Sequence, residues 1–178
     1  MNNLKDKVVL IGMPGCGKSV IGEALSKKLN YDFYDMDIYI EKISGKQIPE
    51  LFLKGEGSFR DWESKACREL CQKQRIVIAC GGGVIKRDEN IVMLQKDSII
   101  IFIDRPIEEI VEDIDVATRP LLKAEPHKIY DLYNERIQLY EKAAHISIKN
   151  DDDIERVLNK IECYLKGAAD EVNDYQWS

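Results

Sequence analysis

The chain has 178 residues, of which 33% are charged and 44% are hydrophobic, and its formal net charge is −6. This length is typical of one globular domain, and the hydrophobic share is too high for wholesale disorder. The excess of acidic residues argues against a nucleic-acid-binding protein, because such proteins need a basic surface to neutralise phosphates. Any anionic ligand must therefore meet a local group of lysines and arginines.

The first apolar run, in MNNLKDKVVLIGMPG, is too short to span a membrane and lacks the long apolar stretch of a secretory signal. The five cysteines have spacings typical of neither a disulfide framework nor a zinc site, so reduced thiols are expected. Both features favour a cytoplasmic protein.

Short apolar runs alternate with longer helical patterns, which is typical of βαβ units and a mainly parallel sheet. Ser58 and Asp61 resemble a capping box at the start of one helix. Residues 113–126 and the tail after Gly167 lack a clear period, so a mobile loop and a frayed end are expected. The expected strands are residues 8–11, 32–35, 76–79, 99–103 and 146–148, and the expected helices are residues 18–29, 38–43, 58–74, 107–113, 128–143 and 154–165.

The segment GMPGCGKS, at residues 12–19, follows an expected strand and precedes an expected helix, as a phosphate-binding P-loop requires. Its glycines would let backbone N–H groups turn toward phosphates, at a helix N-terminus whose partial charge favours anions. Lys18 would reach the β- and γ-phosphates, and Ser19 would supply a hydroxyl to Mg²⁺. The motif predicts a nucleoside triphosphate ligand but does not identify the acceptor.

Two acidic residues lie at the end of the second expected strand. Asp35 and Asp37 are two positions apart, so an extended chain would place both on one side, at the ligand-binding edge of the sheet. Asp35 could hold a water molecule on Mg²⁺, and Asp37 could accept a hydrogen bond from the attacking hydroxyl. An ordinary N-cap of the next helix explains Asp37 equally well.

Three arginines are candidates for binding anionic groups. Arg60 begins a helix, with Glu63 one turn later to hold its guanidinium, and Arg136 lies at the edge of an apolar helical stripe. Together Arg60 and Arg136 could clamp a carboxylate. Arg119 lies in the segment without a clear period, where it could swing over the transferring phosphate. Taken singly, Arg60 and Arg119 also fit ordinary surface residues.

Three consecutive glycines, Gly81, Gly82 and Gly83, follow the third expected strand. Glycines permit a backbone to approach a ligand closely and to offer free N–H donors. A flexible turn is an equally good explanation of this segment on its own.

Six segments occur in the order and at the approximate spacings of the shikimate kinase family, so the sequence resembles that family over residues 8 to about 150. These segments are GMPGCGKS, FYDMDIYIEK, GEGSFRDWE, ACGGGVI, TRPLL and NERIQLYEKAA. The resemblance implies a three-layer P-loop fold with a five-stranded parallel sheet flanked by helices, as in nucleoside monophosphate kinases. It also implies transfer of the γ-phosphate of ATP to the 3-hydroxyl of shikimate, with Mg²⁺, on the route to aromatic amino acids.

The resemblance also implies a role for each matching residue. Gly15, Cys16, Gly17, Lys18, Ser19 and Val20 would bind the ATP phosphates, and Ser19 and Asp35 would serve Mg²⁺. Asp37 would hold the reactive hydroxyl, Arg60 and Arg136 would clamp the carboxylate, and Arg119 would be a lid arginine on the phosphates. Gly82 and its neighbours Gly81 and Gly83 would contact the ring, and Phe52 and Phe59 would line its pocket. Lys18, Asp37 and Arg119 would be the catalytic residues.

The expected organisation is a single, monomeric kinase domain at residues 1–166, followed by a polar tail at 167–178. Residues from about 37 to 65 would bind the substrate, and residues from about 113 to 126 would form the lid. Two departures from the family pattern stand out. Glu112 and Asp113 replace an arginine that often packs on adenine, and Ile137 and Gln138 replace the usual proline region after the clamp arginine.

Two alternative functions remain open from the sequence. Another small-molecule kinase of this architecture, acting on gluconate or a nucleoside monophosphate, would share the P-loop. A monophosphate acceptor would favour additional arginines, whereas this set suits a carboxylate and hydroxyls. A regulatory nucleotide-binding switch would leave Asp37, Arg60 and Arg136 without a joint purpose.

Overall fold

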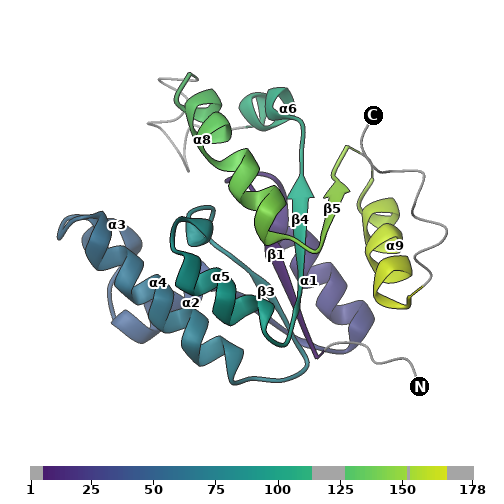
Figure 1. The fold of residues 1–178 in the computed structure, drawn as a ribbon, viewed down its shortest axis with the longest axis horizontal. Coiled ribbons are helices and arrows are strands. Elements are labelled where there is room, and N and C mark those ends of the chain that lie inside the picture. The colour runs from purple at the N-terminus through teal and green to yellow at the C-terminus, as the bar shows by residue number, and fades with distance from the viewer. Residues whose placement is uncertain (1–5, 114–126, 152, 168–178) are drawn as a thin grey trace.

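The computed structural model describes residues 6–113, 127–151 and 153–167. Within these residues, five parallel strands form one sheet in the order β2-β3-β1-β4-β5 (Figure 1). The register pairs Val9 with Ile78 on one side and with Ile100 on the other, so β1 lies at the centre. The strands are β1 (Lys7–Ile11), β2 (Asp32–Asp35), β3 (Ile76–Ala79), β4 (Ile99–Asp104) and β5 (Ile146–Lys149).

Helices cover both faces of this sheet. Helix α1 packs on β1, β2 and β3 and contacts α9, whereas α5 and α8 pack on β4. Helices α2 and α3 pack on α4, and these three gather at one side of the molecule (Figure 1). The helices are α1 (Lys18–Leu29), α2 (Met36–Ser44), α3 (Ile48–Phe52), α4 (Glu56–Cys71), η1 (Val84–Lys86), α5 (Asp88–Gln95), α6 (Ile107–Glu112), α8 (His127–Ala143) and α9 (Ile154–Leu165).

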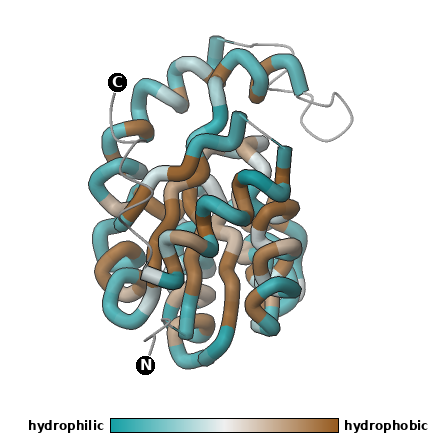
Figure 2. Tube along the Cα trace, turned by 90° about the vertical axis from the view of Figure 1, so that its right-hand side faces the viewer, coloured by the Kyte–Doolittle hydropathy of each residue, from teal (hydrophilic) through white to brown (hydrophobic). Residues whose placement is uncertain are grey.

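The hydrophobic core lies along the central strands, where Figure 2 shows the hydrophobic residues concentrated, while the outer turns of the helices are mostly hydrophilic. Every residue of β1 and β3 is buried. Strands buried on both faces have continuous apolar sequences, which explains the runs VVLI and IVIA. In the part of the chain described here, no helix is both long and apolar enough to cross a lipid bilayer.

The expected α/β class and the five-stranded parallel sheet are confirmed. All five expected strands are present, with β1, β4 and β5 each one residue longer than expected. Helices α3, η1 and α5 were not predicted from the sequence, because helices this short carry too little apolar periodicity to stand out. The expected loop at 113–126, apart from residue 113, and the tail from 168 lie outside the described residues.

Two local expectations about helix starts are wrong. Helix α4 begins at Glu56 with Gly55 as its N-cap, so Ser58 and Asp61 lie inside the helix and form no capping box. Helix α2 begins at Met36, directly after β2, so Asp37 belongs to the first helical turn and not to an extended strand. Its N-cap is Asp35, whose Oδ1 accepts hydrogen bonds from the backbone N–H groups of Asp37 and Ile38, at N···O distances of 3.0 Å and 3.3 Å.

Candidate active site

The carboxyl ends of the parallel strands carry the candidate site. The P-loop follows β1, Asp35 ends β2, and the three glycines lie just after β3. Because neighbouring parallel strands end at the same edge of the sheet, segments far apart in the sequence meet there. The expected gathering of these segments is therefore produced by the fold itself.

The P-loop has the backbone conformation that the motif predicts. Gly15 and Gly17 have φ values of 85° and 97°, a region that residues with a side chain rarely adopt. Gly17 is the N-cap of α1 and contributes no side-chain cap, so the first N–H groups of the helix face the loop. Such a helix N-terminus suits phosphate groups.

Lys18 and Ser19 project from the first turn of α1. Lys18 is buried, and its Nζ donates to the backbone carbonyls of Gly12 at 2.9 Å and Met13 at 2.8 Å. Ser19 Oγ donates to Asp35 Oδ2 at 2.6 Å. Ser19 is exposed, as is Val20 in the next position, and Cys16 is buried beneath the loop. A serine hydroxyl beside a carboxylate is a pair of hard oxygen donors of the kind that Mg²⁺ takes in phosphate sites.

Arg60 is the most constrained cation of the site. Its side chain is buried, and Nη1 donates to both carboxylate oxygens of Glu63 at 2.9 Å. Nε and Nη2 donate to Glu56 Oε1 at 3.2 Å and 3.0 Å. Burial raises the pKa of the Glu63 carboxyl, an effect that Arg60 opposes. The expectation that Glu63 holds Arg60 is confirmed, and Arg60 is no surface residue.

Four other segments approach the loop of three glycines, and three of them occupy space that a side chain on the loop would fill. A Cβ atom at Gly81 would lie 2.8 Å from Asp37 Oδ1, and one at Gly82 would lie 2.9 Å from Cδ of Pro14 in the P-loop. A Cβ atom at Gly83 would overlap the guanidinium of Arg60. The glycine carbonyls matter as well, because Gly82 O accepts hydrogen bonds from α8. Side chains would push these segments apart, so a merely flexible turn does not explain the triple glycine.

Arg136 reaches the same loop from α8. Its side chain is buried, and Nη1 donates to Gly82 O at 3.2 Å. Tyr140, one turn later, donates its hydroxyl to the same carbonyl at 2.5 Å, and burial raises the pKa of this phenol. The Nε of Arg136 is buried without a hydrogen-bond partner. Arg136 and Arg60 therefore contact adjacent residues of one loop, as a shared ligand would require.

Two aromatic side chains line the approach to Arg60. The rings of Phe52, at the end of α3, and Phe59 stack with centroids 4.5 Å apart. The Arg60 guanidinium lies 5.1 Å from the Phe59 ring centroid. Phe59 is buried, whereas Phe52 is 41% exposed, so only Phe52 has a large free surface to offer a ligand.

Two residues that the sequence analysis overlooked hold the P-loop. Asn150, just after β5, donates its Nδ2 to Cys16 O at 2.8 Å. Arg105, just after β4, donates to Gly15 O at 3.4 Å and also binds Glu109 and Asp113. Asp113, which stands where the family pattern often has an arginine, is linked to the P-loop through Arg105. Their positions in the sequence could have indicated this role, because both residues directly follow strands whose carboxyl ends lie near the P-loop. Arg119 lies outside the described residues.

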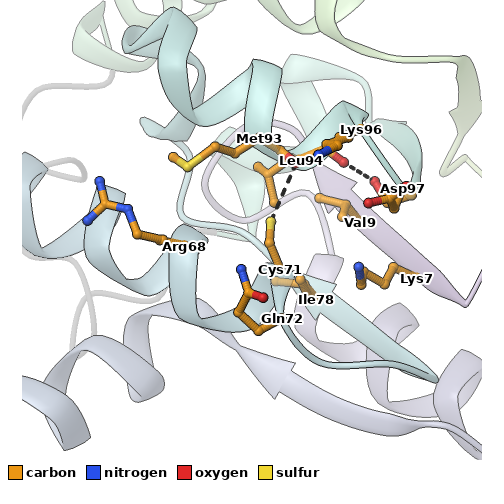
Figure 3. Close-up of a pocket in the computed structure, with 11 residues that line it drawn as sticks. Lys7, Val9, Arg68, Cys71, Gln72, Ile78, Met93, Leu94, Lys96 and Asp97 are labelled. Carbon is orange, nitrogen blue, oxygen red and sulfur yellow. Dashed lines mark hydrogen bonds between the residues drawn. The ribbon is translucent and has the colours of Figure 1, made fainter.

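A separate cavity of about 290 Å³ lies at the opposite edge of the sheet, beside the amino end of β1 (Figure 3). Lys7, Arg68, Cys71, Lys96 and Asp97 are among the residues that line it. Figure 3 shows the guanidinium of Arg68 directed away from Lys7 and Asp97, so Arg68 does not converge with these groups on one ligand. This cavity is remote from the candidate site and takes no part in it.

Comparison with known proteins places the chain in a family. The family model described as shikimate kinase matches residues 14–166. The shikimate kinase of Clostridium beijerinckii is 54% identical over 89% of this chain and 94% of its own length. The chain belongs to the shikimate kinase family. The resemblance seen in the six sequence segments is thereby confirmed, and the chain is an ATP-dependent kinase.

Solved structures agree with this assignment. A shikimate kinase from Acinetobacter baumannii in complex with shikimate matches with a TM-score of 0.85 at 29% identity, covering 99% of this chain and 97% of its own. The shikimate kinase of Aquifex aeolicus matches at 0.81 with 37% identity, covering 92% and 98%. A gluconokinase from Sinorhizobium meliloti matches at 0.58 with 14% identity, covering 98% and 99%, which shows a common fold alone.

The bond from Asn150 to the P-loop generates a prediction about nucleotide binding. Asn150→Ala removes the donor to Cys16 O, and a hydrogen bond of this kind contributes about 1 kcal/mol, so ATP affinity should fall about fivefold. Titration calorimetry with a non-hydrolysable ATP analogue and Mg²⁺ measures the change. Asn159→Ala, on the exposed side of α9, is the matched control and should leave affinity within twofold. Equal affinities for both variants would contradict this role.

Proposed function

We propose that this chain transfers the γ-phosphate of ATP to the 3-hydroxyl of shikimate, giving shikimate 3-phosphate and ADP. The observation that carries the proposal is the meeting of Asp37, Arg60 and Arg136 at the 81–83 loop, with Gly82 packed on the P-loop. This set offers an acceptor for a hydroxyl proton and two guanidinium groups for a carboxylate, beside a phosphate-binding loop. Shikimate carries both a carboxylate and ring hydroxyls.

The P-loop and α1 bind ATP in this mechanism. Backbone N–H groups of residues 15–20 surround the phosphates, and Lys18 Nζ turns from the loop carbonyls to the β- and γ-phosphates. Ser19 and, through a water molecule, Asp35 would hold Mg²⁺, and their adjacent oxygens fit that ion. When bound, Mg²⁺ neutralises charge on the phosphates.

Asp37 acts on the acceptor. It accepts a hydrogen bond from the 3-hydroxyl and takes its proton as the hydroxyl oxygen bonds to the γ-phosphorus and the bond to the ADP oxygen breaks. Asp35 caps α2 and thereby fixes the first turn, which aims Asp37 at Gly81. Arg119 completes the proposal as a lid arginine that stabilises charge on the phosphates, within a lid at about 113–126.

Arg60 and Arg136 hold the carboxylate at the other end of the ring. Glu63 orients Arg60, while Gly82 O orients Arg136, so both guanidinium groups are positioned before the ligand binds. Phe52 offers its exposed face to the substrate ring, the buried Phe59 supports Phe52 by stacking on it, and the backbone of residues 81–83 approaches the substrate ring. We further propose a monomeric, cytoplasmic enzyme of one kinase domain, because the described site residues form a P-loop, an acid and a cation pair without a partner's help and the sequence lacks a secretory signal.

A substrate panel tests the proposed function. Purified protein with ATP and Mg²⁺ should release ADP rapidly when shikimate is added, and only at a background rate with gluconate, quinate or a nucleoside monophosphate. Phosphorus NMR of the product should show a single phosphate ester at the 3-position. ADP release that shikimate does not accelerate would overturn the proposal and favour the regulatory switch, and acceleration by gluconate would favour the sugar kinase.

Asp37→Asn tests the catalytic role. The amide cannot take the hydroxyl proton, so kcat should fall at least about 100-fold while the Kd of ATP stays within twofold. Steady-state kinetics and calorimetry measure the two quantities. Asp32→Asn, at the exposed start of β2, is a matched control that should keep wild-type kcat. A kcat for Asp37→Asn equal to that of the control would remove Asp37 from the mechanism.

Arg60→Ala and Arg136→Ala test the carboxylate clamp. Each variant should weaken shikimate binding by about 2 to 5 kcal/mol, because truncation of a buried charged partner is costly. ATP binding should change little, since the hydrogen-bond and ion-pair partners of both arginines among the described residues lie outside the P-loop. An equal loss of affinity for ATP and shikimate would contradict the assignment. Arg156→Ala, exposed on α9, controls for loss of a surface arginine.

A further inference from the structure

A continuous chain of ion pairs joins the two proposed clamp arginines. Arg60 Nη2 lies 3.0 Å from Glu56 Oε1, and the same oxygen lies 3.0 Å from Lys86 Nζ. Lys86 Nζ is also 3.6 Å from Glu135 Oε1, which is 3.9 Å from Arg136 Nε. The chain runs from α4 through η1 to α8 and so links Arg60 to Arg136.

The two carboxylates on Arg60 differ in their freedom to move. Glu63 is fully buried and binds Nη1 with both oxygens. Glu56 is 49% exposed, is the first residue of α4, and follows Gly55, so its side chain can rotate into solvent at low cost. It nevertheless occupies the Nε and Nη2 edge of Arg60. One carboxylate therefore fixes the arginine, and the other covers a ligand-binding edge of it.

We propose that Glu56 is a placeholder for the substrate carboxylate and so determines specificity for anionic acceptors. This inference rests on the proposed clamp of Arg60 and Arg136. A substrate carboxylate that takes the Nε and Nη2 edge of Arg60 must displace Glu56. One carboxylate then replaces another at this edge while Glu63 stays on Nη1, so the buried Arg60 keeps both of its carboxylate partners throughout, and loss of one would be costly.

Lys86 provides a second position for the displaced side chain. Lys86 bonds the same Oε1 atom as Arg60, and it remains available when Arg60 turns to the substrate. Hydrogen bonds from Lys86 and, to a smaller extent, from Arg60 hold the pKa of the Glu56 carboxyl below its usual range. Glu56 thus stays ionised and keeps a partner after it leaves Arg60.

Arg136 supplies an independent indication of where the ligand carboxylate sits. Its buried Nε lacks a hydrogen-bond partner, and buried donors are normally paired. Glu135, at the far end of the ion chain, is at 3.9 Å from this atom and too distant for a hydrogen bond. A carboxylate bound between the two arginines would satisfy Nε while it replaces Glu56 on Arg60.

The exchange makes acceptor charge a condition of tight binding. A neutral ring compound cannot compensate Arg60, so Glu56 stays in place and blocks part of the clamp. A carboxylate acceptor can displace Glu56, but its binding free energy is reduced by the free energy of the Glu56–Arg60 contact that it breaks. Partly exposed ion pairs of this kind contribute about 1 kcal/mol, which corresponds to about a fivefold change in Kd.

Glu56→Gln is the decisive variant. The amide keeps the shape of the side chain but competes less strongly for Arg60, so the Kd of shikimate should fall threefold to fivefold in calorimetry. The Kd of shikimate methyl ester, which lacks the charge, should stay within twofold of its wild-type value. Glu155→Gln is the control, because it makes the same charge change at the exposed ion pair between α9 and Lys28 of α1, outside the chain of ion pairs that joins Arg60 and Arg136. It should change the Kd of shikimate less than twofold.

Other outcomes overturn the placeholder role. Weaker shikimate binding by Glu56→Gln would show that Glu56 only supports Arg60, and equal tightening by Glu155→Gln would show a general charge effect. Unchanged or equally tightened binding of the acid and the ester would also exclude it. Failure of the proposed function itself looks different, because wild-type protein would then bind no shikimate, or Arg60→Ala would bind it normally.

Discussion

The site depends on the contact between a glycine loop without side chains and a buried arginine. Gly83 leaves the space that the Arg60 guanidinium fills, and Glu63, buried one turn away on α4, fixes the arginine there. Gly81 and Gly82 leave space for Asp37 and for the P-loop proline in the same way. Three consecutive positions therefore bring together the P-loop, Asp37 and the proposed carboxylate clamp.

Burial of cations at one edge of the sheet is compatible with the proposal that an acidic protein binds two anionic ligands. Lys18, Arg60 and Arg136 are all buried at the carboxyl edge of the sheet, and each is compensated by nearby oxygens of the chain. We propose that some of these contacts break when a ligand binds, whereas others, such as the contact of Glu63 with Arg60, persist and orient the cation. We propose that the loop carbonyls release Lys18 to phosphates and that Glu56 releases Arg60 to a carboxylate. The net charge of −6 is thus compatible with a local cationic site.

The sheet and the P-loop could be predicted because their signals are local. Apolar runs such as VVLI and IVIA mark buried parallel strands, and GMPGCGKS combines its glycines, lysine and serine in eight residues. The pairing of Arg60 with Glu63 was also accessible, since helical spacing places them one turn apart. Helices α3 and α5 were missed, because eight or fewer residues give too little periodicity.

Contacts between distant segments could not be derived from spacing. The N-cap role of Asp35, in place of Asp37, depends on where β2 ends within one residue. The bonds of Asn150 and Arg105 to the P-loop join residues separated by 134 and 90 positions. The ion chain through Lys86 likewise requires η1 to lie between α4 and α8. Such pairs become visible only when the order of strands places their ends side by side.

A double-mutant cycle for Gly83→Ala and Arg60→Ala, read as the Kd of shikimate, tests the central claim most directly. If the missing side chain at residue 83 serves to seat Arg60, Gly83→Ala should weaken binding about tenfold or more in the wild-type background. It should have almost no further effect once Arg60 is alanine, because its target is gone. Gly57→Ala, where an added Cβ atom meets nothing within 4 Å, should leave the Kd unchanged. Additive effects of the two substitutions would contradict the account.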